Sequence, residues 1–189
     1  MGHALGTETS MRRVVWAEYV SVDGVVDAPS WTRAFWNDEL SRMQKEQLFR
    51  SEALLLGRVT YEAFAQSWPT MTDPDGFADR MNRLPKHVAS RTLKKFDWNA
   101  KPIEGDVADG VARLKQQSGG DLLIYGSASL VSSLIPHDLI DEYRLMVHPV
   151  VVGRGRHLVR DIAQTKTLKL TDTKSLTSGV VVLSYEPSR

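Results

Sequence analysis

The sequence contains no cysteine among its 189 residues. This absence excludes disulfide bonds, thiolate metal ligands and thiol nucleophiles. The five histidines show none of the usual metal-ligand spacings, so we expect no metal site. No apolar run is long enough to cross a bilayer, and residues 1–10 lack the charged and apolar segments of a signal peptide. We interpret residues 1–10 as a disordered leader or a cloning remnant.

The chain also lacks an excess of charge of one sign, since 24 basic and 23 acidic residues leave a formal net charge of +1. This balance gives no general attraction to nucleic acid or to acidic surfaces. We therefore expect no nucleic-acid or membrane partner, and the absence of cysteine is compatible with the cytoplasmic location that we expect. No linker rich in glycine, serine or proline divides the chain. Residues 11–189 are predicted to form one domain.

Strand and helix patterns alternate through the first two-thirds of the chain, and strands dominate the last third. Apolar and β-branched runs predict strands at 12–21, 53–56, 86–90, 101–104, 121–125 and 139–147, with a continuation at 150–152. The last two strands form a hairpin at 165–175 and 179–186. Helices are expected at 32–50, capped by Thr32, and at 59–66, 77–82, about 106–119 and after residue 125. The pattern predicts a three-layer α/β fold with a mostly parallel central sheet and antiparallel C-terminal strands.

The stretch from Leu122 to Leu130 is an apolar strand that runs through Gly126 and Ser127 into a helix. Such a junction leaves backbone N–H groups free at the positive end of the helix dipole, where phosphate binds readily. Glycine permits close approach of a ligand, and Ser127 and Ser129 add hydroxyl groups. The same junction is also common as a purely structural turn.

Two other apolar strands end in similar junctions, Gly57-Arg58 and Ser90-Arg91. Because the carboxyl ends of parallel strands share one edge of a sheet, all three junctions are expected to converge there. They would offer a polyphosphate two helix N-termini, two guanidinium groups and the hydroxyls of Thr60, Ser90, Thr92, Ser127 and Ser129. Two arginines suit a terminal phosphate such as an adenosine 2′-phosphate. The alternative is that both arginines are solvated surface charges.

Five motifs carry a resemblance to a known family. They are Ser21-Val22-Asp23-Gly24, Leu56-Gly57-Arg58-Val59-Thr60-Tyr61-Glu62, Ser90-Arg91-Thr92-Leu93, Gly126-Ser127-Ala128-Ser129-Leu130, and Leu139-Ile140-Asp141-Glu142-Tyr143-Arg144 followed by Pro149-Val150-Val151-Val152-Gly153-Arg154-Gly155. In this order, over residues 12–185, the chain resembles the dihydrofolate-reductase-like superfamily. It is most similar to the RibD C-terminal-domain group, the pyrimidine reductases of riboflavin synthesis and their stand-alone relatives.

The resemblance implies that the chain binds NADPH and forms a homodimer through about residues 141–152. It implies Gly57, Arg58 and Thr60 near the pyrophosphate and 2′-phosphate. Ser90 and Arg91, with Thr92, would hold the adenosine ribose phosphate. The pyrophosphate and nicotinamide would be wrapped by Gly126, Ser127, Ala128, Ser129 and Leu130. The family usually carries Gly-Gly where this chain has Gly126-Ser127.

The proton donor is less plain from the sequence. Related reductases place an acid early in the first long helix, and Asp38 or Glu39 is the nearest match, with a solvated surface acid as the alternative. Asp23 would lie near the substrate, although Asp-Gly is also a turn signal. Trp31 and Trp36 are expected either to wall the substrate pocket or to belong to the core.

These observations predict an NADPH-dependent reductase of a small heterocyclic or carbonyl compound. The zinc deaminase motifs H-x-E and P-C-x-x-C of bifunctional riboflavin proteins are absent from the chain. The alternatives are a non-catalytic nucleotide-binding member of the fold, or a flavin or folate binder.

Overall fold

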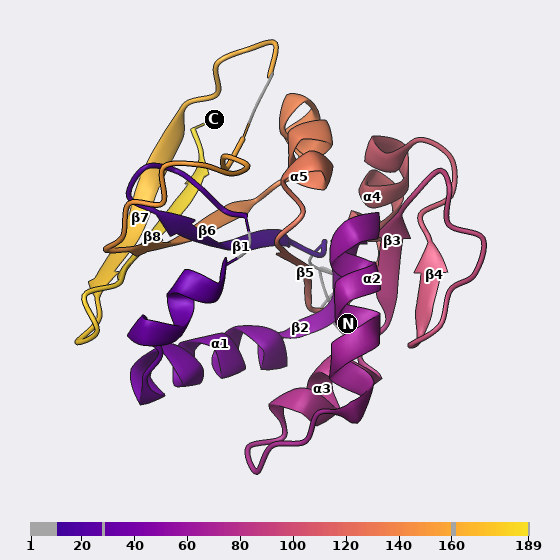
Figure 1. Cartoon of the computed structure of the whole chain (residues 1–189). Coiled ribbons are helices and arrows are strands. Elements are labelled where there is room, and N and C mark those ends of the chain that lie inside the picture. The colour runs from indigo at the N-terminus through magenta and orange to yellow at the C-terminus, as the bar shows by residue number, and fades with distance from the viewer. Residues whose placement is uncertain (1–10, 28, 160–161, 189) are drawn as a thin grey trace, which may run out of the picture.

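The centre of the molecule is an eight-stranded sheet with the order β4-β3-β2-β5-β1-β6-β8-β7 (Figure 1). The computed structural model describes residues 11–27, 29–159 and 162–188, so the interpretation of residues 1–10 lies outside the described residues. The strands are β1 (Val14–Ser21), β2 (Ser51–Gly57), β3 (Lys86–Ala89), β4 (Ala100–Pro102), β5 (Asp121–Tyr125), β6 (Glu142–His148), β7 (Leu168–Ser175) and β8 (Val181–Pro187). The strands from β4 to β6 pair in parallel, and β8 and β7 are antiparallel to their neighbours. This arrangement confirms the predicted sheet.

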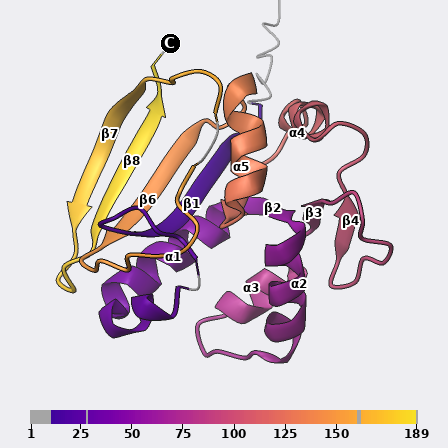
Figure 2. The same cartoon turned by 45° about the horizontal axis from the view of Figure 1, so that its top comes forward.

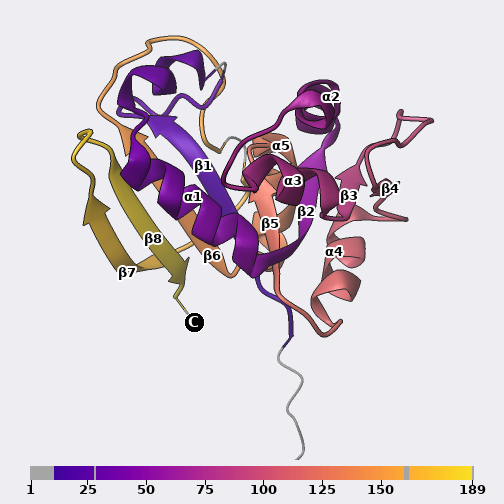
Figure 3. The same ribbon diagram turned by 90° about the horizontal axis from the view of Figure 1, so that it is seen from below.

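Helices cover both faces of the sheet (Figures 2 and 3). One face carries α1 (Asp38–Arg50), α2 (Arg58–Ser67) and α3 (Phe77–Arg83), and the other carries α4 (Val107–Lys115) and α5 (Ala128–Leu134). Short 3-10 helices are η1 (Pro29–Phe35), η2 (Trp68–Thr70) and η3 (Ile135–His137). A hydrophobic core lies on each face of the sheet, and successive side chains of β1 alternate between the two cores. Val15 and Ala17 pack on the α1 face, and Val14 and Trp16 pack on the α5 face. The three-layer prediction is therefore confirmed.

Several element boundaries differ from the prediction. Thr32 lies within η1, and α1 is capped instead by Asn37, whose side-chain oxygen accepts the Leu40 N–H at 2.9 Å. Asparagine followed by Asp38 and Glu39 is the stronger helix start, because both acids lie at the positive end of the dipole. The first turn of the predicted helix is therefore a separate segment. None of the described helices has the length and apolar character needed to cross a membrane.

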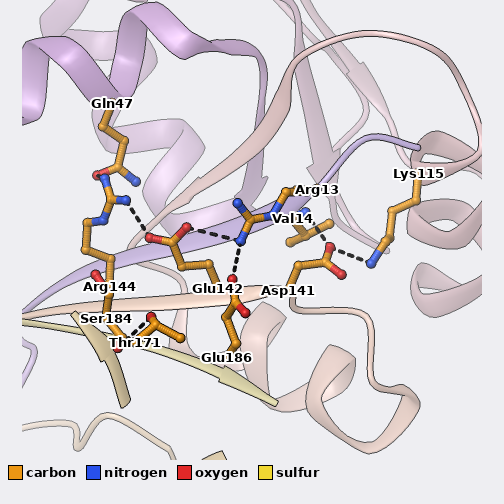
Figure 4. A network of polar contacts seen from close by, with 10 residues as sticks. All are labelled: Arg13, Val14, Gln47, Lys115, Asp141, Glu142, Arg144, Thr171, Ser184 and Glu186. Carbon is orange, nitrogen blue, oxygen red and sulfur yellow. Dashed lines mark hydrogen bonds and ion pairs between the residues drawn. The ribbon is translucent and has the colours of Figure 1, made fainter. Parts of the chain in front are cut away.

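A polar network fixes the amino ends of β1 and β6 (Figure 4). Arg13 donates hydrogen bonds to Glu142 and to Glu186, and Arg144 donates to Glu142 and to Gln47 of α1. These contacts join β1, β6, β8 and α1 at the end of the sheet where β1 and β6 begin.

Asp141 extends this network to α4. Its carboxylate accepts the Val14 N–H at 2.8 Å and a hydrogen bond from Lys115. The Val14 side chain is fully buried, so its amide has no ready access to water once this acceptor is removed.

Asp141→Ala is expected to lower the free energy of unfolding by about 2–3 kcal/mol, because a buried amide and an ammonium group lose one acceptor. Urea denaturation measures the change. Asp79→Ala is the matched control, since the exposed side chains of Asp79 and Arg83 pair at 3.7 Å on α3, and it should cost less than about 1 kcal/mol. Equal losses in the two variants would contradict the role given to Asp141.

Candidate functional site

Three neighbouring strands end at one edge of the sheet. β3, β2 and β5 are adjacent and parallel, with Gly57 opposite Ala89 and Leu55 opposite Ile124. The segments that follow these strands, residues 57–60, 90–92 and 126–130, are called the strand-end loops below. All three line a single cleft of about 1600 Å³. The predicted convergence of the three junctions is therefore present in the structure.

The loop after β5 is held against the end of β2 by Ser127. The Gly57 N–H donates to the Ser127 Oγ at 2.7 Å, and the Thr60 Oγ1 lies 3.2 Å from the same oxygen. A Cβ atom at Gly57 would lie 2.2 Å from that oxygen, so no other residue fits at position 57 without a shift. Ser127 reaches this place with a left-handed backbone, at φ 62°. Its hydroxyl thus ties two strand-end loops together.

At position 127 glycine should give a more stable protein than alanine, which is the reverse of the usual order. Ser127→Ala loses the tie and keeps the left-handed strain, so the free energy of unfolding should fall by about 1–2 kcal/mol. Ser127→Gly also loses the tie but relieves the strain, and it should be about 1 kcal/mol more stable than Ser127→Ala. Chemical denaturation compares them, with Ser129→Ala as a cleft control. If Ser127→Ala proved as stable as Ser127→Gly, the left-handed backbone at position 127 would carry no strain, and the prediction would be wrong.

The two arginines of the loops differ in their partners. Arg58 donates to Glu62 at 3.0 Å one helical turn away, and both side chains are about half exposed. Arg91 is exposed and has no ion pair among the described residues. The Ser90 Oγ accepts the N–H groups of Thr92 and Leu93, which shapes the turn after β3. Both guanidinium groups therefore remain within reach of the cleft without being needed by the core.

Glu18 is the buried carboxyl group of the cleft. β5 ends at Tyr125, opposite Ala17, and β1 continues past it, so Glu18 faces the turn at Gly126. Its residue is only 7% exposed, and its nearer oxygen is 4.0 Å from the position of a Cβ on Gly126. Burial raises the pKa of Glu18 to about 8, and the Tyr19 N–H and the charge of Arg156 offset this only in part. The side chain is therefore mainly protonated at pH 7.

Glu18 should make stability depend on pH with a defined sign. The folded protein keeps a proton between pH 4.5 and about 8 that the unfolded chain loses, so stability falls as pH rises through this window. From pH 5.5 to 8.5 the wild type should lose about 2–4 kcal/mol more than Glu18→Gln. Urea unfolding at several pH values measures the difference. The exposed Glu104→Gln should follow the wild type, and a parallel Glu18→Gln curve would refute the assignment.

Large apolar side chains wall the part of the cleft on the α1 face. We call this part the aromatic half, and it is formed by Trp36, Phe64, Trp68, Met71 and Phe77. The Trp68 ring lies 5.6 Å from Phe77 and 6.2 Å from Phe64, measured between ring centres. Trp36 and Met71 are 49% and 47% exposed, so the aromatic half presents apolar surface to a ligand in the cleft.

Comparison with known proteins shows the family to which the chain belongs. Residues 12–183 match the model of the RibD C-terminal domain. The chain belongs to the RibD C-terminal domain family. The uncharacterized Bacillus subtilis protein YyaP is 31% identical over 177 residues, which cover 92% of this chain and 94% of YyaP. Membership in this family supports a reductase-type role.

Solved structures share the fold of this RibD C-terminal domain. A protein of Shewanella sp. PV-4 assigned to riboflavin biosynthesis superposes with a TM-score of 0.78 at 17% identity, over 94% of this chain and 99% of that chain. A pyrimidine reductase-like protein of Corynebacterium diphtheriae gives a TM-score of 0.66 at 14% identity, over 94% and 92% of the two chains. At these identities the likeness shows the fold alone.

The acids proposed from the sequence for this family member lie in different places. Asp38 lines the cleft at the start of α1. Glu39 instead accepts hydrogen bonds from the N–H and hydroxyl of Thr177 in the β7–β8 hairpin. Asp23 accepts from Ser21, Val152 and Gly153, and these bonds lower its pKa to about 2. Neither Glu39 nor Asp23 lines the cleft, and each has a clear structural partner.

Of the two tryptophans predicted for the substrate pocket, Trp31 and Trp36, only Trp36 lines the cleft. Trp36 stands in the wall of the cleft, between η1 and α1. Trp31 is not part of that wall, and its ring packs edge-on against buried His148 at 5.3 Å between ring centres. Its ring N–H donates to the Asp27 carbonyl oxygen at 3.3 Å. Trp31 therefore anchors the η1 segment that borders the cleft.

The sequence analysis missed Glu18, Tyr19 and Gln44. A glutamate inside an otherwise apolar strand was the available signal for Glu18, since charged residues are seldom buried. Gln44 gave no signal, because a polar residue on a helix is ordinary. Only the fold shows that its amide lies buried between two tyrosines.

Proposed function

We propose that this protein is an NADPH-dependent reductase of a small heterocyclic or carbonyl compound. The observation that carries the proposal is that three strand-end loops line one cleft, which suits a long dinucleotide. Family membership supports the same reaction class. NADPH would supply the hydride, and the protein would supply binding, orientation and a protected site.

The cleft residues fit such a cofactor. α2 has no side-chain cap at Gly57, so the N–H groups of its first turn, from Arg58 onward, are available to a phosphate, while the Gly57 N–H is taken by Ser127. Gly126 has no side chain to fill the space beside Thr60, whereas the space in front of Gly57 is taken by the Ser127 hydroxyl. Arg58 and Arg91 would contact the 2′-phosphate, and Ser90, Thr92 and Ser129 would add hydroxyl contacts. Glu18, protonated at neutral pH, would offer an O–H group beside the turn at Gly126.

Cofactor preference tests this proposal. Isothermal titration should show that NADPH binds at least about tenfold more tightly than NADH, because a charged hydrogen bond contributes about 1.5–3 kcal/mol. FMN and folate, titrated alongside, should bind more weakly. Equal affinity for NADPH and NADH, or no binding of either, would contradict the proposal.

Arg58→Ala sharpens the same test. It should weaken NADPH by about 1.5–3 kcal/mol and leave NADH nearly unchanged, because only NADPH carries the 2′-phosphate. Loss of the exposed Arg58–Glu62 pair should cost the free protein less than about 1 kcal/mol. Arg83→Ala is the matched control, since Arg83 makes the same kind of pair with Asp79 on α3. A large loss of stability in Arg58→Ala would show instead that Arg58 is structural.

We also propose a homodimer. β6 lies between β1 and β8, so both of its backbone edges are already paired. An interface at residues 141–152 must therefore use side chains, and Val151, which is 73% exposed, is available to it.

A further inference from the structure

One hydroxyl proton in the cleft lacks an acceptor among the described residues. Gln44, in α1, is only 3% exposed and lies between two tyrosines. Its Nε2 donates to the Tyr19 hydroxyl oxygen at 2.9 Å and to the Met146 sulfur at 2.9 Å. Its Oε1 accepts the hydroxyl proton of Tyr125 at 3.2 Å.

The Met146 sulfur decides the orientation of the Gln44 amide. A thioether carries no proton and can only accept, so the NH₂ group must face Met146 and Tyr19. The Tyr19 oxygen then accepts one of these two protons. Its own proton has to point elsewhere, and no described residue accepts it. Because Tyr19 lines the cleft, this proton is available to a bound molecule.

The residues around Tyr19 indicate the shape and charge of the molecule that would accept this proton. The Tyr19 ring lies edge-on to Trp36, at 6.3 Å between ring centres, and the other walls of the aromatic half are equally apolar. Such walls favour a flat ring system. The charged groups there are Arg42, Lys45, Asp38, Asp73 and Asp75. The three carboxylates outnumber the two basic groups, one of which, Lys45, lies 3.7 Å from Asp75, so this half has no net positive charge to attract a phosphate.

We propose that the aromatic half binds a planar, conjugated, uncharged ketone, and that the Tyr19 hydroxyl donates a hydrogen bond to its oxygen. Gln44 and Tyr125 position Tyr19 and do not touch the substrate. This inference rests on the proposed function, because NADPH supplies the hydride. The hydride adds to the carbonyl carbon, the π-electron pair moves to oxygen, and that oxygen takes the Tyr19 proton. Water then returns a proton to the phenolate.

The acid strength of Tyr19 agrees with this role. Burial raises the pKa of Tyr19 above its usual value. The phenol therefore stays neutral and able to donate, while an alkoxide is still basic enough to take its proton. Donors that are fixed before the reaction stabilise a developing oxyanion most effectively.

Ligand binding without cofactor tests the donor directly. The probes are 9-fluorenone and its parent hydrocarbon fluorene, which has the same rings and no oxygen, titrated by quenching of tryptophan fluorescence. Wild type should prefer fluorenone by about three- to tenfold, the effect of one neutral hydrogen bond, and Tyr19→Phe should lose this preference while still binding fluorene. Tyr143→Phe is the control, because Tyr143 is buried on the opposite face, against Trp16.

Turnover gives the second readout. With NADPH and 9,10-phenanthrenequinone, Tyr19→Phe should lower kcat about a hundredfold and raise KM about three- to tenfold, whereas Tyr143→Phe should behave as wild type. A retained preference for fluorenone in Tyr19→Phe, or displacement of fluorenone by ribose 5-phosphate, would overturn the inference. NADPH binding without reduction of the quinone would overturn this inference alone. Absence of NADPH binding would overturn the proposed function as well.

Discussion

The close approach of the loop after β5 to the end of β2 is the constraint on which the cleft depends. The Gly57 amide donates to the Ser127 hydroxyl, at a position where a Cβ would collide with that oxygen. This contact brings Thr60 and the turn at Gly126 together and sets the spacing between two strand-end loops. Parallel pairing of β3 with β2 then adds the third loop at the same edge. A site for an extended ligand thus follows from strand order and one hydrogen bond.

The two faces of β1 give the cleft two chemical characters. Glu18 points to the α5 face and lies beside Gly126, where burial keeps it protonated at neutral pH. Tyr19 belongs to the opposite side, where it packs with the α1-face core and meets Gln44. One strand therefore supplies a buried acid near the strand-end loops and a phenol in the aromatic half. Its amino end is fixed by a separate polar network through Arg13, far from the chemistry.

Much of the fold could be predicted from the sequence, because the signals were local and strong. The wholly apolar run at 53–56, in β2, predicts a strand covered on both faces, as in a parallel sheet. The strand–Gly–Ser–helix junction at 126–127 predicts a binding loop at the edge of that sheet. The start of α1 was misplaced because Thr32 resembles a cap, while the better cap, Asn37, lies five residues later. The network at Gln44 could not be predicted, because it depends on how α1 rests on β1 and β5. Roles that depend on packing between distant elements need coordinates.

Hydrogen–deuterium exchange with and without NADPH is the most direct test of the central claim, that one dinucleotide contacts all three strand-end loops. We expect NADPH to slow exchange of the amides in residues 57–60, 90–92 and 126–130 together. Amides of the β7–β8 hairpin should remain unchanged and serve as the internal reference. Protection of only one loop, or protection confined to a different surface, would contradict the account.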